Sequence, residues 1–244
     1  RPLTTRVMVT MLPPMSALVD VSEVEKDYPL GNLSVKALRG VDLRIQAGEF
    51  TAIAGPSGSG KTTLLNLIGC VDVPTQGRVT VAGRCTSELD DDGLTELRLR
   101  KLGFIFQTFN LVPVLDVFQN VEFPLLLQGE LDAQARRERV ESIVERVGLT
   151  GQMIQRPNEL SGGQRQRVAI ARALVTQPTI VLADEPTANL DSDTGERILA
   201  LMRELNQQEG TTFIFSTHDE RVMNHARRLV RLEDGQIADA GKVD

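Results

Sequence analysis

The sequence is poor in the residues that build disulfide frameworks and zinc sites. It has no tryptophan, one tyrosine, two cysteines and two histidines. Two cysteines are too few for a disulfide framework, and this scarcity is typical of a protein in a reducing, cytosolic compartment. A structural zinc site would need histidines beside Cys70 and Cys85, but neither His218 nor His225 stands at a metal-ligand spacing. A disulfide-stapled secreted module and a small zinc domain are therefore excluded.

A long uncharged apolar segment is also missing. A membrane-spanning helix needs about 18 to 20 consecutive apolar residues. The most apolar stretch, residues 111–127, is interrupted by Pro113, Pro124 and acidic residues. The start of the chain carries two arginines before a short apolar part that a pair of prolines breaks, which does not fit a signal peptide. We expect no transmembrane segment, and we expect residues 1–17 to form a flexible tail.

The composition is that of a globular protein with an acidic balance. The chain has 244 residues, of which 41% are hydrophobic and 25% are charged. This excludes wholesale disorder and allows one large α/β domain or two small ones. Lysine and arginine number 27 against 33 acidic residues, a net charge of −6. A mainly basic surface for nucleic acid is therefore not expected.

The spacing of apolar residues predicts strands and helices in alternation. Residues 19–53 alternate with period two and predict strands, a hairpin and a final buried strand. Strand–helix–strand alternation later in the chain implies right-handed crossovers and a mostly parallel sheet covered on both faces. The other predicted strands are 77–83, 179–183 and 211–215, and the predicted helices outside the middle of the chain are 63–68, 162–174 and 194–208.

The middle of the chain has a different pattern. Residues 94–159 are rich in helical spacing, and we interpret them as a helical insertion. Asp132 is the predicted N-cap of one helix, and Gly148 stands where its C-terminal cap belongs. The alternative is that these helices are further layers of the core.

The stretch from Gly55 to Thr62 fits the phosphate-binding pattern G-x-x-x-x-G-K-[ST]. Glycines let the backbone approach phosphate oxygens closely, and the N–H groups of the loop and the next helix face the anion. Lys61 supplies a positive charge for the β- and γ-phosphates, and the Thr62 hydroxyl is a ligand for Mg²⁺. The preceding apolar strand and the following helix disfavour a chance glycine-rich turn. The candidate nucleotide-binding residues are Gly55, Ser57, Gly58, Ser59, Gly60, Lys61, Thr62 and Thr63.

Two acidic residues, Asp184 and Glu185, end the predicted strand 179–183. In open α/β sheets ligands bind at the carboxyl ends of the strands, so this pair is expected beside the phosphate loop. Asp184 would hold Mg²⁺ through water, and Glu185 would polarise the attacking water. Taken alone, an acid at a strand end is more often a solvated loop residue.

A second candidate phosphate-binding helix start is the segment 160–164, with the sequence Leu-Ser-Gly-Gly-Gln. Ser161 can cap the helix, and the free N–H groups of its first turn carry a positive dipole end. The alternative is an ordinary N-cap. Three arginines further along this helix, Arg165, Arg167 and Arg172, are interpreted as a solvated or ion-paired face.

The phosphate loop, the 160–164 segment and the acidic strand end together resemble the ATP-binding-cassette (ABC) ATPases. The resemblance implies an α/β fold: a phosphate-loop (P-loop) NTPase core with a mostly parallel sheet, an N-terminal antiparallel β part and an inserted helical subdomain. It implies a single nucleotide-binding domain at 18–244, with the core at 18–93 and 160–244 and the helical subdomain at 94–159. Shorter segments resemble the branch that serves macrolide export and lipoprotein release.

The resemblance also assigns roles that the residues alone do not. Gln107 is similar to the glutamine that touches Mg²⁺ and the attacking water, and His218 is similar to the switch histidine on the γ-phosphate. Asp191 corresponds to a residue that crosses between subunits, and Tyr28 to an aromatic that stacks on adenine. Without the resemblance, Gln107 reads as a surface residue, His218 as the end of a strand and Tyr28 as core. The segment expected to bind the partner's ATP comprises Ser161, Gly162, Gly163 and Gln164.

The resemblance finally implies a function and partners. Two chains would sandwich two ATP molecules head to tail with Mg²⁺, and hydrolysis would drive a separate membrane permease. The chain would then be cytoplasmic and peripheral on the inner face of the membrane. Two alternatives remain open: a regulator of a membrane partner that transports nothing, as in a divisome, and a soluble ATPase of DNA repair or translation. Apolar residues after Gln107 would lie beside the groove for a permease helix: Phe109, Leu111, Val112, Val114, Leu115 and Phe118.

Overall fold

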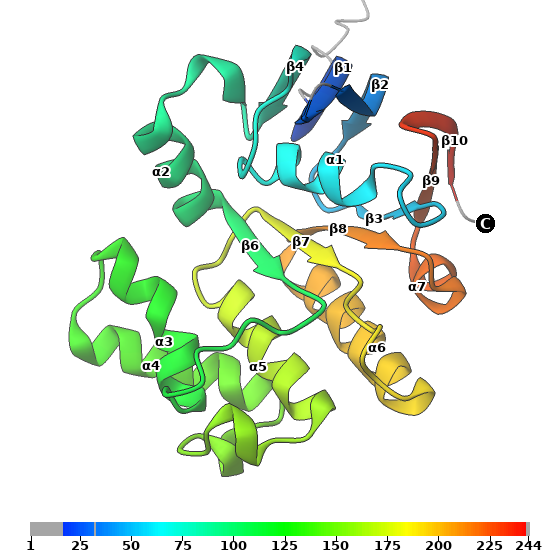
Figure 1. Ribbon diagram of the computed structural model, residues 1–244. Helices are drawn as coiled ribbons and strands as arrows, with labels where there is room; N and C mark the ends of the chain where they lie inside the picture. The colour runs from blue at the N-terminus through cyan, green and yellow to red at the C-terminus, as the bar shows by residue number, and fades with distance from the viewer. Residues whose placement is uncertain (1–16, 32, 243–244) are drawn as a thin grey trace, which may run out of the picture.

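Two β-sheets enclose the helix that follows the phosphate loop. Figure 1 shows the chain as a computed structural model, which describes residues 17–31 and 33–242. The tail predicted at 1–17 lies outside the described residues, apart from Ala17. Within the described ranges, none of the helices combines the length and apolar character that a membrane crossing requires.

The first sheet is antiparallel and has the strand order β2-β1-β4-β5. Alternate side chains of its strands are buried, such as Val19 and Val21 of β1 and Val41 and Leu43 of β2, as period two requires. The N-terminal antiparallel part expected from the sequence is therefore present. Its strands are β1 (Val19–Leu30), β2 (Leu33–Ile45), β4 (Gln76–Val81) and β5 (Arg84–Cys85).

The second sheet has the order β10-β9-β3-β8-β7-β6, and all its neighbouring strands are parallel except β9 and β10. The mostly parallel sheet predicted from the sequence is confirmed. Its strands are β3 (Phe50–Ala54), β6 (Leu102–Ile105), β7 (Ile180–Asp184), β8 (Thr212–Thr217), β9 (Arg228–Glu233) and β10 (Gln236–Lys242).

The parallel sheet separates two apolar cores. On β8, Phe213 and Phe215 point into one core, while Ile214 points into the other. The first core packs against α3, α4, α5 and α6, and the second lies against α1, α2 and the antiparallel sheet (Figure 1). The helices are α1 (Lys61–Ile68), α2 (Asp91–Lys101), α3 (Val117–Gln128), α4 (Ala133–Arg146), α5 (Gly162–Leu174), α6 (Ser192–Glu209) and α7 (Glu220–His225), with short 3₁₀ turns η1 (Thr86–Glu88), η2 (Thr150–Gln152) and η3 (Pro157–Glu159).

One strand lies where the sequence predicts only helix. β6 pairs in parallel with β7 and forms an edge of the core sheet, so the helical interpretation of 94–159 is wrong for Leu102–Ile105. The segment has four residues, three of them buried, and therefore shows no alternation. Gly103 explains the close packing: a Cβ there would lie 2.3 Å from the carbonyl oxygen of Ala173 on α5. The division into core and helical subdomain stays a prediction, with β6 on the core side.

The predicted helix ends of the middle region agree with the structure. The Asp132 side chain accepts a hydrogen bond from the backbone N–H of Ala135 at 2.9 Å, which caps α4. Gly148 follows α4 with a φ of 68°, a left-handed conformation that glycine adopts at little cost. Asp234 and Gly235 form the turn that joins β9 to β10. Local chemistry thus sets these boundaries.

Candidate functional site

The phosphate loop connects β3 to α1 and requires glycine at both of its ends. A Cβ on Gly55 would lie 2.0 Å from the carbonyl oxygen of Leu232, so no larger residue fits. Gly60 has a φ of 102° and immediately precedes Lys61, the first residue of α1. The loop therefore ends directly at a helix N-terminus, where free N–H groups attract an anion.

Lys61 is fixed against the loop that it follows. Only 7% of this residue is exposed, and its Nζ donates hydrogen bonds to the carbonyl oxygens of Gly55 at 2.8 Å and Pro56 at 2.9 Å. Beside it, the Ser59 hydroxyl is buried and has no hydrogen-bond partner among the described residues. A buried lysine charge and an orphaned hydroxyl within a tight glycine loop fit a phosphate ligand.

Asp184 and Glu185 lie at the carboxyl end of β7, beside α1. The Thr62 hydroxyl donates to Asp184 Oδ2 at 3.5 Å, so two hard oxygen ligands meet at one point. Glu185 has a φ of 47°, in the left-handed region that non-glycine residues seldom adopt. Its backbone N–H donates to the carbonyl of Ser216 on β8 at 2.9 Å, which holds the turn in place.

His218 follows β8 and contacts Glu185 directly. Its Nδ1 lies 2.6 Å from Glu185 Oε1, and the Thr217 hydroxyl donates to Glu185 Oε2 at 3.4 Å. Most of the histidine side chain, 70%, remains exposed, whereas only 14% of the glutamate side chain is. The carboxylate is thus held by two neighbours while the imidazole keeps one edge free.

Asp219 ties this histidine segment to the segment after Glu185. It accepts a hydrogen bond from the Thr187 hydroxyl at 3.0 Å and from two guanidinium nitrogens of Arg221. The hydrogen bond from Arg221 holds the pKa of the Asp219 carboxyl below its usual range, against a smaller opposing effect of burial. Asp219 therefore connects the segment after β8 to the segment after Glu185.

These segments line one cavity of about 640 Å³, the phosphate-loop cavity. It brings together most of the residues predicted from the phosphate loop and the strand ends. Residues of β2 also line it, and the sequence analysis did not find them because no motif marks them. The lining residues are Val35, Lys36, Ala37, Pro56, Ser57, Gly58, Gly60, Lys61, Thr62, Thr63, Gln107, Asp184, Glu185, Ser216 and His218.

Gln107 reaches this cavity from the segment that follows β6. The residue is exposed, as the sequence alone suggested, and it stands opposite the loop that follows Glu185. The Asn189 side chain donates to the backbone carbonyl of Gln107 at 2.7 Å. The position of the Gln107 backbone therefore depends in part on the loop that follows Glu185.

The segment 161–164 lies apart from the phosphate-loop cavity within the chain. Ser161 caps α5 by accepting from the N–H of Gln164 at 3.3 Å, and the Gln164 side chain accepts in return from the Ser161 N–H at 2.8 Å. Ser161, Gly163 and Gln164 line a separate cavity of about 540 Å³. Asp191 caps α6 by accepting from the N–H of Thr194 at 3.0 Å. One chain alone does not bring these residues to its own phosphate loop.

Tyr28 also stands outside the lining of the phosphate-loop cavity. Its hydroxyl donates to Asp72 Oδ2 at 2.9 Å, and Lys26 Nζ lies 5.0 Å from the centre of its ring. Lys26 itself donates to Asp72 Oδ1 at 2.6 Å. Burial, aided by Asp72, raises the pKa of the tyrosine hydroxyl. One ring face therefore carries a lysine charge, and the ring is held in a fixed orientation.

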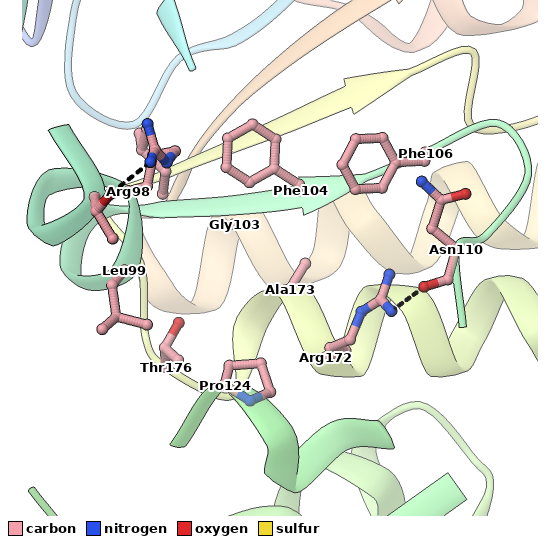
Figure 2. Close-up of a pocket in the computed structure, with 12 residues that line it drawn as sticks. Arg98, Leu99, Gly103, Phe104, Phe106, Asn110, Pro124, Arg172, Ala173 and Thr176 are labelled. Atoms are coloured by element: carbon pink, nitrogen blue, oxygen red, sulfur yellow. Dashed lines mark hydrogen bonds between the residues drawn. The ribbon is translucent and has the colours of Figure 1, made fainter. Parts of the chain in front are cut away.

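A third hollow lies between α2, β6, α3 and α5, and Figure 2 shows its lining. This groove has a volume of about 340 Å³. Arg98 stands at one end and Arg172 at the other, with Phe104 and Phe106 between them. Its lining residues are Thr95, Arg98, Leu99, Leu102, Gly103, Phe104, Phe106, Asn110, Pro124, Arg172, Ala173 and Thr176.

A buried strand, a glycine loop, a helix N-terminus and carboxylates on the neighbouring strand end define a phosphate-loop nucleotide-binding protein. Residues 38–188 match the family described as ABC transporter. The chain belongs to this family, which confirms the predicted class, and it is an ATP-binding and hydrolysing domain of that class.

Relatives of known sequence place the chain in the predicted branch. An uncharacterised ABC transporter ATP-binding protein of Methanocaldococcus jannaschii is 46% identical over 90% of this chain and 95% of its own length. The LolD ATP-binding protein of the lipoprotein-releasing system of Anaeromyxobacter dehalogenans is 48% identical over 94% and 96%. The macrolide export protein MacB of Syntrophobacter fumaroxidans is 46% identical, over 90% of this chain but only 31% of the longer protein.

A solved structure supports the same assignment. The archaeal cassette in a dimeric post-hydrolysis state, bound to ADP and phosphate, superposes with a TM-score of 0.86 at 45% identity. The match covers 93% of this chain and 99% of that one. The predicted fold is therefore confirmed.

Proposed function

We propose that this chain binds ATP with Mg²⁺ in the phosphate-loop cavity and that its hydrolysis drives a membrane permease. The observation that carries the proposal is the convergence of Lys61, Asp184, Glu185 and His218 on one cavity. The phosphate loop supplies N–H groups and a lysine charge, which position and neutralise the phosphates. The relatives named LolD and MacB support the transport role.

The residues of the cavity fit a magnesium ion. Thr62 Oγ1 and Asp184 Oδ2 lie 3.5 Å apart, and hydroxyl and carboxylate oxygens are ligands that Mg²⁺ accepts together with water and phosphate oxygens. When bound, the ion neutralises charge that develops on the phosphates. Gln107 stands in the same lining and completes the polar wall.

Glu185 is the proposed group that orients and deprotonates the attacking water. Its carboxylate is held by His218 and Thr217, so its direction is fixed before substrate binds. His218 reaches Glu185 through Nδ1, and its Nε2 edge is left free to face the γ-phosphate, where Nε2 must carry a proton to donate to a phosphate oxygen. This pair therefore performs proton transfer and charge positioning at one end of the cavity.

A second copy of the chain is the proposed source of the missing part of the site. Ser161 and Gly163 stand at a capped helix N-terminus that opens into a different cavity, away from the phosphate loop of the same chain. In a head-to-tail dimer this helix start would face the phosphates of the partner, with Asp191 beside the contact. The dimeric state of the archaeal relative supports this arrangement.

The groove and the apolar surface beside it form the proposed contact with the permease, which would hold the chain peripherally at the cytoplasmic face of the membrane. Val114 is 72% exposed and Phe106 is 37% exposed, and exposed apolar surface of this kind is typical of a partner site. Other residues of the predicted contact pack inward instead: Phe109 is buried, and Leu111 and Phe118 lie against the first apolar core. Val114 is therefore the residue to test, because Leu115 is half-buried.

Replacement of Lys61 by alanine tests the function. The variant removes the charge that the loop holds at 2.8 and 2.9 Å from two carbonyls, so productive ATP binding is expected to be lost. ATP affinity and steady-state ATPase rate are the measurements. Equal rates for the Lys61→Ala variant and the parent chain would overturn the assignment of the phosphate loop.

A further inference from the structure

The segment that carries Gln107 continues into two strained residues. Phe109 has a φ of 63° and Asn110 a φ of 47°, and neither is glycine. Left-handed backbone at such residues costs free energy and persists only where neighbouring groups fix it. Phe109 and Asn110 stand two and three positions after Gln107. A neighbouring group must therefore stabilise their backbone conformation.

Arg172 is that neighbour. Its guanidinium donates to the carbonyl oxygen of Phe109 at 2.8 Å and to that of Asn110 at 2.5 Å. Figure 2 shows the side chain rising from α5 toward Asn110 at the end of the groove. The prediction of a solvated or ion-paired face is therefore wrong for Arg172, because the folded chain turns it onto the backbone of a distant segment.

Among the residues that the structure describes, no carboxylate is paired with the charge of Arg172. Burial lowers the pKa of this guanidinium, and no acidic group of the described chain acts to raise it. A partly buried charge is costly unless hydrogen bonds compensate it. Here the compensation comes from two carbonyl oxygens, and hydrogen bonds from a charged donor are about twice as strong as neutral ones.

Two further contacts hold the segment from Gln107 to Asn110. Asn189, on the loop after Glu185, holds the carbonyl of Gln107 at 2.7 Å from the cavity side. The guanidinium of Arg165 lies 5.2 Å from the centre of the Phe109 ring. Gln107 therefore sits between one anchor on the cavity side and one anchor, Arg172, on the groove side.

We propose that Arg172 is a positioning residue that sets Gln107 in the phosphate-loop cavity by holding the carbonyl oxygens of Phe109 and Asn110. The inference rests on the proposed ATPase function, in which Gln107 contacts the metal and the attacking water. Loss of the guanidinium frees the segment, so Gln107 leaves its place while the phosphate loop stays intact. The turnover number should then fall and the KM for ATP should change little.

A double-mutant cycle tests this role. Arg172→Ala and Gln107→Ala should each lower kcat, on the order of tenfold or more, since small misplacement of a positioning group is costly. The double variant should be no slower than Gln107→Ala alone, because the arginine acts only through the glutamine. If the losses in kcat of the two single variants multiply in the double variant, the proposal is overturned. A parent-like kcat in Arg172→Ala would also overturn it. Lys61→Ala in the same assay shows separately whether the cavity hydrolyses ATP.

A rescue variant separates positioning from general stability. Glycine adopts positive φ freely, so Asn110→Gly should keep the bend without its anchor and restore part of the kcat lost in Arg172→Ala. An effect of lost packing would not be restored in this way. Arg172→Lys, with one ammonium for two carbonyls, should be intermediate, and it replaces Arg172→Ala in the cycle if that variant does not fold.

Arg98 provides the matched control. It lines the opposite end of the same groove and also donates to a backbone carbonyl, that of Cys70, but among the described residues no hydrogen bond joins it to the Gln107 segment. Arg98→Ala should keep kcat near the parent value in both the Gln107 and the Gln107→Ala backgrounds. Suppose instead that Arg98→Ala lowers kcat in the parent chain but not in the Gln107→Ala background. Any damage to the groove would then reproduce the result for Arg172→Ala, and a specific role for Arg172 would be refuted.

Discussion

The phosphate-loop cavity and the groove are both lined by the segment after β6, but they are built differently. The cavity takes its walls from strand ends and loops, with polar and charged groups such as Lys61, Asp184 and Glu185. The groove lies between helices and an edge strand and is mostly apolar, with arginines only at its ends. The first is suited to position charge, and the second is the proposed site for a side chain or helix of the permease. In this proposal, one short segment separates ATP chemistry from coupling to the permease.

The largest expected effect is in the cavity. Glu185→Gln keeps the shape of the side chain but removes its ability to accept a proton, so hydrolysis should fall on the order of 10²- to 10⁴-fold. ATP binding should persist, and the trapped nucleotide should hold two chains together. Size-exclusion chromatography with ATP over a dilution series, beside an ATPase assay, measures both outcomes. A variant that stays monomeric at high concentration would speak against the sandwich dimer.

The next largest effect on hydrolysis is expected at the N-terminus of α5. Within one chain this helix start lies outside both the phosphate-loop cavity and the groove. Ser161→Arg should block closure onto the partner's phosphates and cost about 10²-fold or more in hydrolysis, the usual loss for one positioned donor. Nucleotide binding by the same chain should remain. Mixing this variant with Lys61→Ala should recover activity, because a mixed dimer has one site with an intact loop and an intact helix start. No recovery in any mixture would contradict the arrangement across two chains.

The parts of the cavity that the sequence predicts are those fixed by local chemistry. The loop from Gly55 to Thr62 needs its glycines for close backbone approach, and the caps Asp132 and Ser161 satisfy helix N–H groups a few residues away. Asp184 was recognisable because an acid at the end of a buried strand faces the ligand edge of a parallel sheet.

The parts that the sequence does not predict depend on packing between distant segments. β6 is four residues long and mostly buried, so it carries no alternating pattern. Arg172 has the sequence context of an exposed helical arginine, and only the approach of the segment at 109–110 gives it two carbonyl partners. Val35 and Ala37 reach the cavity through the register of the β1–β2 hairpin, which no motif specifies.

On the groove side, substitution of a single exposed residue should weaken binding to the permease without changing ATP hydrolysis by the isolated chain. Val114 is 72% exposed, so Val114→Glu should leave folding and basal ATPase near the parent level, as surface changes usually do. Binding to a co-expressed permease partner should weaken roughly ten- to a hundredfold, because the new charge loses water without gaining a partner. Co-purification and ATPase rate are measured together. Val114→Thr, which keeps the shape without a charge, is the control and should co-purify normally; retained binding by Val114→Glu would remove Val114 from the contact.

The smallest effect concerns stability at low pH, and it should arise at the cavity and not at the groove. The hydrogen bonds from Arg221 and Thr187 lower the pKa of Asp219 in the folded chain. A lowered folded pKa means that the ionised group stabilises the fold above its unfolded pKa of about 4, and that this contribution is lost as the pH falls through the folded value. Solvent screening limits it to about 1 kcal/mol or less.

Asp219→Asn should therefore be less stable than the parent at pH 7, and the difference should shrink as the pH falls below about 4. Arg172→Lys is the control, because it alters a cation that donates only to carbonyl oxygens. Its difference in stability from the parent should stay the same between pH 7 and pH 3. Urea unfolding midpoints between pH 7 and pH 3 give both differences under identical conditions. If the Asp219→Asn difference is constant with pH, the carboxylate is not what holds the His218 segment, and Thr187 and Arg221 must hold it through contacts that do not depend on charge.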